Sequence, residues 1–216
     1  MTIVPFSYPS YARSERIADG VIHGIGVLFA LAGATLLVAS AATTHGGGTA
    51  VAVGVYGAAL MATFLASACY HMTPWDRLRP ALRRLDHAAI FLKIAGTVTP
   101  LAVLVGSPFA YAVLALVWTV ALLGMAAKLL PGRDPGWLGV APYLGLGWLG
   151  VLLLYPLALT LPVTALVLAA AGGLLYTAGV GFYLREGLKF SNAIWHGFVL
   201  AASGCFFAAI ALGTSA

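Results

Sequence analysis

Seven long apolar runs dominate this sequence, and they limit what the chain can fold into. A helix needs about 20 mostly apolar residues to span a bilayer, and each run is close to that length. Charged residues make up only 8% of the chain, whereas soluble domains carry roughly 25%. The sequence therefore predicts an all-α, polytopic membrane protein with seven transmembrane helices. The expected spans are 20–43, 48–71, 85–105, 109–130, 136–157, 161–184 and 191–212.

Short connections rich in turn-forming residues separate these runs, such as HGGG after the first and PGRDPG after the fourth. We expect a single seven-helix transmembrane domain at residues 20–216. A short cytoplasmic N-terminal segment, residues 1–19, precedes it.

The basic residues are distributed very unevenly over the connections. Of the eleven Lys and Arg residues, only Lys93 lies deep inside an apolar run. The other ten precede the first span or belong to alternate connections, with Lys128 in the last turn of the fourth span. Cytoplasmic loops carry an excess of Lys and Arg. We therefore expect a multi-pass protein of the inner (plasma) membrane with a cytoplasmic N-terminus and an outside C-terminus. The ten residues are Arg13, Arg16, Arg77, Arg79, Arg83, Arg84, Lys128, Arg133, Arg185 and Lys189.

This distribution also indicates the partners of the chain. Basic residues along one membrane face can meet anionic lipid headgroups, so the net charge of +5 indicates membrane lipids and excludes nucleic acid as the partner. The oligomeric state stays open.

Polar residues recur at the expected cytoplasmic ends of the spans. Residues four apart share one face of a helix, and a polar residue in hydrocarbon usually faces the bundle interior. Three histidines at similar depth, together with a carboxylate, predict either a metal site or a proton-transfer site. The residues are the pairs Asp19 and His23, Ser67 and His71, and Asn192 and His196, with Asp86 at the start of the third span.

Each of these residues also has a purely structural interpretation. His71 ends a span and could be solvated at the interface, and His23 could be a hydrogen-bonded packing residue. Asp86 and Asn192 could cap the helices that they open, because Asp and Asn are favoured at that position. Lys93 could pair with Asp86 or extend its amine toward the cytoplasmic side.

Four stretches, VIHGIG, SACYH, RRLDHAAIFLKIAGTVTP and NAIWHGFVLAASGCFF, together resemble the bacterial hemolysin III branch of the progestin and adipoQ receptor family. Their order and spacing correspond from about residue 15 to residue 207. The resemblance implies seven membrane helices and a cytoplasmic N-terminus. It also implies kinship with alkaline ceramidases, which are proposed to be metal-dependent membrane hydrolases.

In the receptor members of that family, an S-x-x-x-H motif, a later Asp and an H-x-x-x-H motif form a zinc site near the cytoplasmic face. By this resemblance Ser67 and His71 match the first motif. Asp86 matches the acid associated with the zinc-bound water, and His196 matches the second histidine of the last motif.

One residue departs from the family pattern. Asn192 stands where the resemblance implies a histidine ligand, and an amide is a far poorer zinc ligand than imidazole. Three outcomes follow: a zinc site made by His71, His196 and Asp86, a site that recruits His23, or no metal.

The first functional hypothesis is a zinc-dependent hydrolase acting on a lipid amide or ester. Asp86 would take a proton from the attacking water, and Ser67 would orient a ligand or donate to the developing oxyanion. His23, Asn192 and Asp19 would support the metal ligands.

Two other hypotheses remain. The chain could be a non-enzymatic, receptor-like protein that senses a small lipid ligand and acts in membrane homeostasis. It could also be cytolytic or pore-forming, as the family's name implies, although its spans are apolar throughout and include no amphipathic pore-lining helix.

Overall fold

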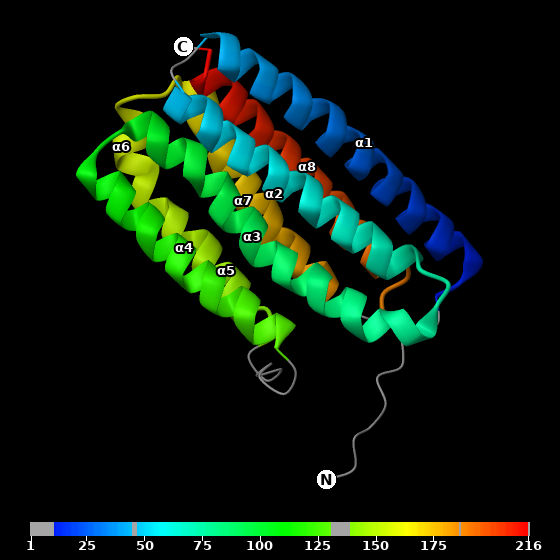
Figure 1. The fold of residues 1–216 in the computed structure, drawn as a ribbon. Helices are drawn as coiled ribbons and strands as arrows, with labels where there is room; N and C mark the ends of the chain where they lie inside the picture. The colour runs from blue at the N-terminus through cyan, green and yellow to red at the C-terminus, as the bar shows by residue number, and fades with distance from the viewer. Residues whose placement is uncertain (1–10, 45–46, 131–138, 186, 216) are drawn as a thin grey trace.

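A computed structural model describes residues 11–44, 47–130, 139–185 and 187–215, and the regular structure of these residues is entirely helical (Figure 1). Seven helical segments are long and apolar enough to cross a membrane, which confirms the predicted fold class. The elements are α1 (Arg13–Thr44), α2 (Gly47–Met72), η1 (Asp76–Leu78), α3 (Arg79–Val105), α4 (Pro108–Leu129), α5 (Ala141–Leu149), η3 (Gly150–Leu153), α6 (Leu154–Ala158), α7 (Val163–Tyr183) and α8 (Ser191–Gly213).

The helices form a closed bundle in which α8 returns to pack against α1 (Figure 1). Successive long helices pack against one another, and α3 is the most buried of the seven spans. The start of α1 and the end of α8 lie at opposite ends of the bundle. Because α1, α2, α3 and α8 are neighbours, residues of equal depth on these four helices can meet in one place.

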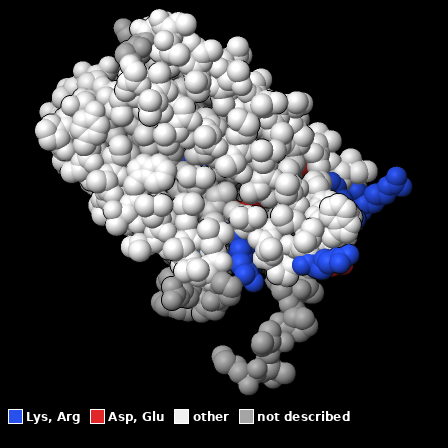
Figure 2. All heavy atoms as spheres, viewed as in Figure 1, with Lys and Arg blue, Asp and Glu red and all other residues white. Residues whose placement is uncertain are grey.

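The outer surface of the bundle suits a lipid environment. Large apolar side chains such as Leu28, Leu36 and Leu123 are well exposed, and in the view of Figure 2 the Lys and Arg side chains gather at the end where α1 begins. Arg133 lies outside the described residues. We call the end where α1 begins the basic end.

The fifth span differs from the continuous helix expected at 136–157. Its described part consists of α5, the 3-10 turn η3 and α6, and residues 136–138 lie outside the described ranges. Glycines loosen the segment, because glycine lacks a Cβ to restrict the backbone. Pro156 inside α6 lacks the N–H that a continuous helix would use. The length of an apolar run in the sequence does not reveal these effects of glycine and proline on the helix.

Two helices start well before their expected spans. The third span was expected from residue 85, but α3 begins at Arg79, with Pro80 in its first turn. Asp86 therefore lies inside α3, and the interpretation of Asp86 as a helix cap is wrong, since Leu78 occupies the N-cap position. Likewise α1 begins at Arg13, ahead of the expected residue 20. Apolar length measures only the part of a helix in hydrocarbon, and both helices continue past it.

Close packing of α2 against α3 depends on Gly96. A Cβ added at this position would lie 2.5 Å from the Cβ of Ala59, and small residues let membrane helices approach closely. We expect Gly96→Ala to lower stability by about 1–3 kcal/mol, as overpacking does, measured as unfolding of the purified protein in detergent. Gly54→Ala is the matched control, because a Cβ at Gly54 meets no atom within 4 Å. Equal stability of the two variants would contradict this role of Gly96.

Candidate metal centre

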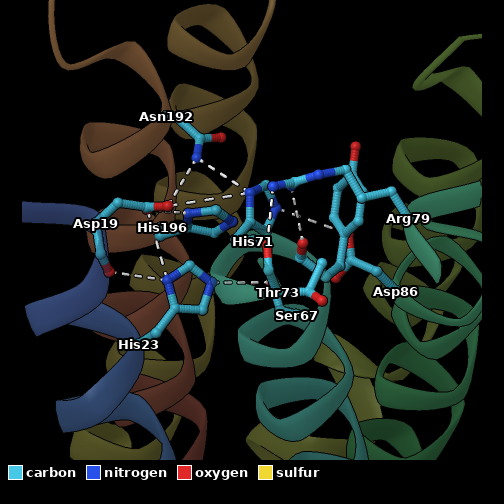
Figure 3. A network of polar contacts seen from close by, with 10 residues as sticks. Asp19, His23, Ser67, His71, Thr73, Arg79, Asp86, Asn192 and His196 are labelled. Carbon is cyan, nitrogen blue, oxygen red and sulfur yellow. Dashed lines mark hydrogen bonds and ion pairs between the residues drawn. The ribbon is translucent and has the colours of Figure 1, made fainter. Parts of the chain in front are cut away.

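Three histidines from α1, α2 and α8 meet at the basic end of the bundle (Figure 3). His23, His71 and His196 each offer a ring nitrogen, and these nitrogens all lie within 4.8 Å of one another. The ring centroids of His23 and His196 are 4.3 Å apart, and those of His71 and His196 are 4.6 Å apart. His23 and His196 are buried and His71 is mostly so. The imidazoles of the three helices thus converge, as the shared depth of the polar pairs predicted.

Asp19 is the central acceptor of the cluster. Its Oδ1 lies 2.7 Å from His196 Nδ1, and its Oδ2 accepts a 2.9 Å hydrogen bond from the side-chain amide of Asn192. Asp19 is 4% exposed, and a buried carboxylate is stable only when it is paired or hydrogen-bonded. Asp19 therefore ties α1 to α8 and fixes the ring of His196.

His23 is oriented by its own helix. Its Nδ1 lies 2.8 Å from the backbone oxygen of Asp19, one turn earlier in α1. Because a carbonyl oxygen can only accept, Nδ1 carries the proton and Nε2 keeps its lone pair. That Nε2 lies 3.2 Å from the Ser67 hydroxyl on α2, so Ser67 can donate to it.

Asn192 joins the cluster and does not cap α8. Its side-chain nitrogen lies 2.9 Å from Asp19 Oδ2 and 3.3 Å from His71 Nδ1. Phe190 holds the N-cap position of α8, so the capping interpretation of Asn192 is wrong. The amide holds His71 against the Asp19 carboxylate, which lies 3.9 Å from His71 Nδ1.

Asp86 lies on the opposite side of His71. Its Oδ2 is 4.0 Å from His71 Nε2. Ser67 lies one turn before His71 on α2, and its hydroxyl contacts His23 Nε2 at 3.2 Å. The expected grouping of Ser67, His71 and Asp86 is present in the structure.

Arg79 holds together the ends of α2 and α3 beside the cluster. Its guanidinium donates to the Thr73 carbonyl at 2.8 Å, to the Tyr70 carbonyl at 3.5 Å and to Asp76 Oδ1 at 2.9 Å. From the sequence, Arg79 was expected only as one of the basic residues of a cytoplasmic connection. In the sequence, the presence of Asp76 three residues before Arg79 is the feature that could have predicted this ion pair.

Lys93 does not join the cluster. Its amine donates to Ser203 on α8 at 2.7 Å, and it neither pairs with Asp86 nor extends to the basic end. Both interpretations of Lys93 are therefore wrong.

A small pocket lies at the basic end of the bundle, beside Asp19 and His71. At its rim, Phe190 has a left-handed φ of 63° and its backbone N–H donates to Glu15 Oε1 at 2.8 Å. This bond fastens the connection before α8 to the first turn of α1. The pocket is lined by Tyr11, Glu15, Arg16, Asp19, His71, Met72, Phe190, Asn192 and Ala193.

The three imidazoles could hold a metal ion. Three protein ligands are the usual set of a catalytic zinc site, and metal-binding histidines commonly give their second ring nitrogen to an oxygen acceptor. His23 and His196 both do so, through the carbonyl and the carboxylate of Asp19. Among the described residues, the metal-competent group contains His23 and not Asp86. Of the outcomes considered, recruitment of His23 therefore fits the geometry better than a ligand set containing Asp86.

The chain is similar to known membrane proteins over most of its length. A family model described as haemolysin-III related matches residues 11–207. The Bacillus cereus protein named hemolysin-3 is 36% identical over 195 residues, which cover 89% of each chain. A hemolysin-3 homolog from Bacillus subtilis (strain 168) is 33% identical, covering 91% of this chain and 93% of its own. The Homo sapiens monocyte to macrophage differentiation factor is 28% identical, covering 72% of this chain and 67% of its own.

The role of Asp19 can be tested by removing only its charge. We expect Asp19→Asn to lower the free energy of unfolding by about 1–3 kcal/mol, because buried donors on α8 lose their charged acceptor. Denaturant unfolding in detergent measures the change. Asp76→Asn is the matched control, since the Asp76 side chain is 92% exposed and exposed ion pairs contribute about 0–1 kcal/mol. A larger loss for Asp76→Asn would contradict the central role of Asp19.

Proposed function

This chain belongs to the haemolysin-III related family, and from that premise we propose that it is a zinc-dependent hydrolase of lipid amides or esters. Its seven apolar helices make it a multi-pass protein of the plasma membrane. The observation that carries the proposal is the convergence of three imidazoles with Asp19, Asp86 and Ser67 in a buried, polar cluster. Such groups are costly in an apolar bundle, so their gathering indicates chemistry.

His23, His71 and His196 would hold the zinc ion, with Asp19 keeping His196 in position. Bound zinc supplies Lewis acidity, which polarises a carbonyl and makes water a better nucleophile near neutral pH. The remaining protein groups are then available for proton transfer and hydrogen bonding.

Asp86 is the proposed general base. Its carboxylate lies 4.0 Å from His71 Nε2, which leaves it beside the imidazoles and able to accept a proton from an attacking water. A positioned general base typically contributes about 10²–10⁴-fold to the rate. Ser67, whose hydroxyl lies beside His23, would donate its proton to the oxygen on which charge develops.

The basic end is proposed to face the cytoplasm, because Lys and Arg flank it and cytoplasmic loops are enriched in these residues. The substrate would be a membrane lipid whose amide or ester reaches the headgroup region at that face. Water would enter through the pocket beside Asp19 and His71.

A second candidate is a lipid-sensing, receptor-like protein without turnover. Asn192 favours this alternative, because an amide stands where the resemblance implies a third family ligand. Lipid would then change the conformation of the protein without being cleaved.

The zinc part of the proposal predicts different effects at His23 and Asn192. The wild-type protein, purified and dialysed, should retain about one zinc ion per chain, as a site with three protein ligands would. His23→Ala should lose most of it, whereas Asn192→Ala should keep more, because Asn192 acts only through hydrogen bonds to Asp19 and His71. Elemental analysis measures the zinc, and circular dichroism checks that each variant is folded. If the His23→Ala variant retained a full zinc ion per chain, His23 would be excluded as a zinc ligand.

The hydrolase part predicts release of a carboxylic acid from lipid. The protein, reconstituted with a panel of ceramides and phospholipids, should release free fatty acid detectable by mass spectrometry. Asp86→Asn should slow release about 100-fold or more, as expected for loss of a general base, and Asp76→Asn should leave it unchanged. Lipid-dependent conformational change with no acid released from any lipid would favour the receptor-like alternative.

A further inference from the structure

Asn192 is the residue at which this chain departs from the pattern of its family, and it contacts two members of the polar cluster. In Figure 3 its amide nitrogen points to both Asp19 and His71. The nitrogen lies 2.9 Å from Asp19 Oδ2 and 3.3 Å from His71 Nδ1. These two atoms are themselves 3.9 Å apart, beyond the reach of a direct hydrogen bond. The amide therefore links a carboxylate and an imidazole that do not bond to each other.

The Asp19 carboxylate determines which way the Asn192 amide points. A carboxylate oxygen accepts hydrogen bonds, so it selects the NH2 group of the amide and not the amide oxygen. If the amide were turned, its oxygen would face Asp19 Oδ2, and two acceptors would meet with no proton between them. Asp19 cannot move away easily, because its other oxygen lies 2.7 Å from His196 Nδ1. The orientation of the amide is therefore fixed by its partner on α1.

The amide in turn determines which nitrogen of His71 carries the proton. An NH2 group can only donate, so His71 Nδ1 accepts from Asn192, and the proton of the neutral ring is on Nε2. His71 Nε2 lies 4.0 Å from Asp86 Oδ2. An N–H group beside a carboxylate is electrostatically favourable, so Asp86 supports the same tautomer.

The other two imidazoles of the cluster have the opposite tautomer. His23 Nδ1 donates to the backbone carbonyl of Asp19, and His196 Nδ1 donates to the Asp19 carboxylate. Both rings therefore keep a lone pair on Nε2, which is the usual arrangement of a histidine that binds a metal. At His71 the lone pair is on Nδ1, where it already accepts from Asn192. Two of the three imidazoles are thus set to bind a metal ion, and the third is not.

A metal ion can bind His71 only if the hydrogen bond from Asn192 is lost. Binding at Nδ1 takes the lone pair that the amide uses. Binding at Nε2 moves the ring proton to Nδ1, where it meets the N–H of the amide. Turning the amide removes that conflict, but its oxygen then faces Asp19 Oδ2. Every route therefore sacrifices a hydrogen bond of Asn192, which opposes metal binding at His71.

We propose that Asn192 holds His71 in the tautomer protonated on Nε2 and thereby competes with zinc for this imidazole. The inference rests on the proposed function for the identity of the metal, and it deepens that function by giving Asn192 a part in metal loading. Asn192 is a positioning residue, because it acts through its hydrogen bonds to Asp19 and His71. Its effect is to weaken zinc binding at a site that is otherwise complete.

The tautomer of His71 can be measured directly on the full chain in detergent, after a chelator has removed metal. Nitrogen-15 NMR of labelled histidines distinguishes protonated from unprotonated ring nitrogens, at about pH 8, where an unperturbed histidine is neutral. The His71 signals are those missing from the spectrum of His71→Gln. His71 should be protonated on Nε2, and His23 and His196 on Nδ1. Protonation of His71 on Nδ1 in the wild type would overturn the proposal.

Replacing Asn192 by leucine tests the competition with zinc. Leucine is similar in size and donates no hydrogen bond, so His71 Nδ1 can carry the proton and donate to Asp19 Oδ2, now 3.9 Å away. The NMR spectrum of metal-free Asn192→Leu should show this change of tautomer. Its affinity for zinc should exceed that of the wild type about tenfold or more, the effect of one hydrogen bond to a charged group. Competition with a chromophoric zinc chelator measures the Kd.

Asp76→Asn is the control, because it changes an exposed side chain at the same end of the bundle and should alter neither the tautomer nor the Kd for zinc. Equal or weaker zinc binding by Asn192→Leu, shown to be folded by circular dichroism, would overturn the competition. The wild-type spectrum needs no variant to fold, no zinc and no lipid, so it tests the tautomer independently of the hydrolase. Tighter zinc binding by Asn192→Leu without release of fatty acid from any lipid would support this proposal and contradict the hydrolase.

Discussion

The buried carboxylate of Asp19 is the interaction on which the site depends. A charge inside an apolar bundle is stable only with full hydrogen bonding, and here the donors come from His196 and Asn192 on α8. Meeting that requirement fastens α1 to α8 and, through the Asp19 backbone carbonyl, turns His23 toward the same centre. The contact between α1 and α8 at this end and the orientation of His23 and His196 therefore have one physical cause. This is why a residue expected only to support the site proves to be its centre.

The fold and the composition of the candidate site were largely predictable from the sequence, because a bilayer imposes length and depth on every helix. Apolar length predicted the seven spans, and polar residues at one end of several spans had to occupy one layer. The i, i+4 spacing of Ser67 with His71 then predicted that both face the same way. These predictions need only the periodicity of a helix and the depth of each residue in the membrane. They do not require knowledge of which helices are neighbours.

The details that sequence could not predict depend on contacts between distant residues. Asn192 has the local signature of a cap, but Asp19, separated from it by 173 positions, determines its hydrogen bond. Lys93 was expected to turn toward Asp86 on its own helix, yet its acceptor is Ser203, separated from it by 110 positions. The helix of Asp86 begins earlier than apolar length indicates, since polar turns outside hydrocarbon remain helical. For Asn192 and Lys93, a distant residue determined which of the locally possible hydrogen bonds forms. For the start of α3, the deciding factor was the polar region outside the hydrocarbon, which apolar length does not describe.

The division of the histidine cluster among α1, α2 and α8 has a consequence for the making of the protein. Ribosomes deliver helices to the membrane in chain order, so His23 and His71 are inserted while His196 has yet to be translated. Until α8 is inserted, the Asp19 carboxylate on α1 lacks both of its hydrogen-bond donors from α8. The cluster is thus completed by the arrival of the final helix, and a chain arrested earlier carries two imidazoles without the third. Maturation of the site and closure of the bundle are one event.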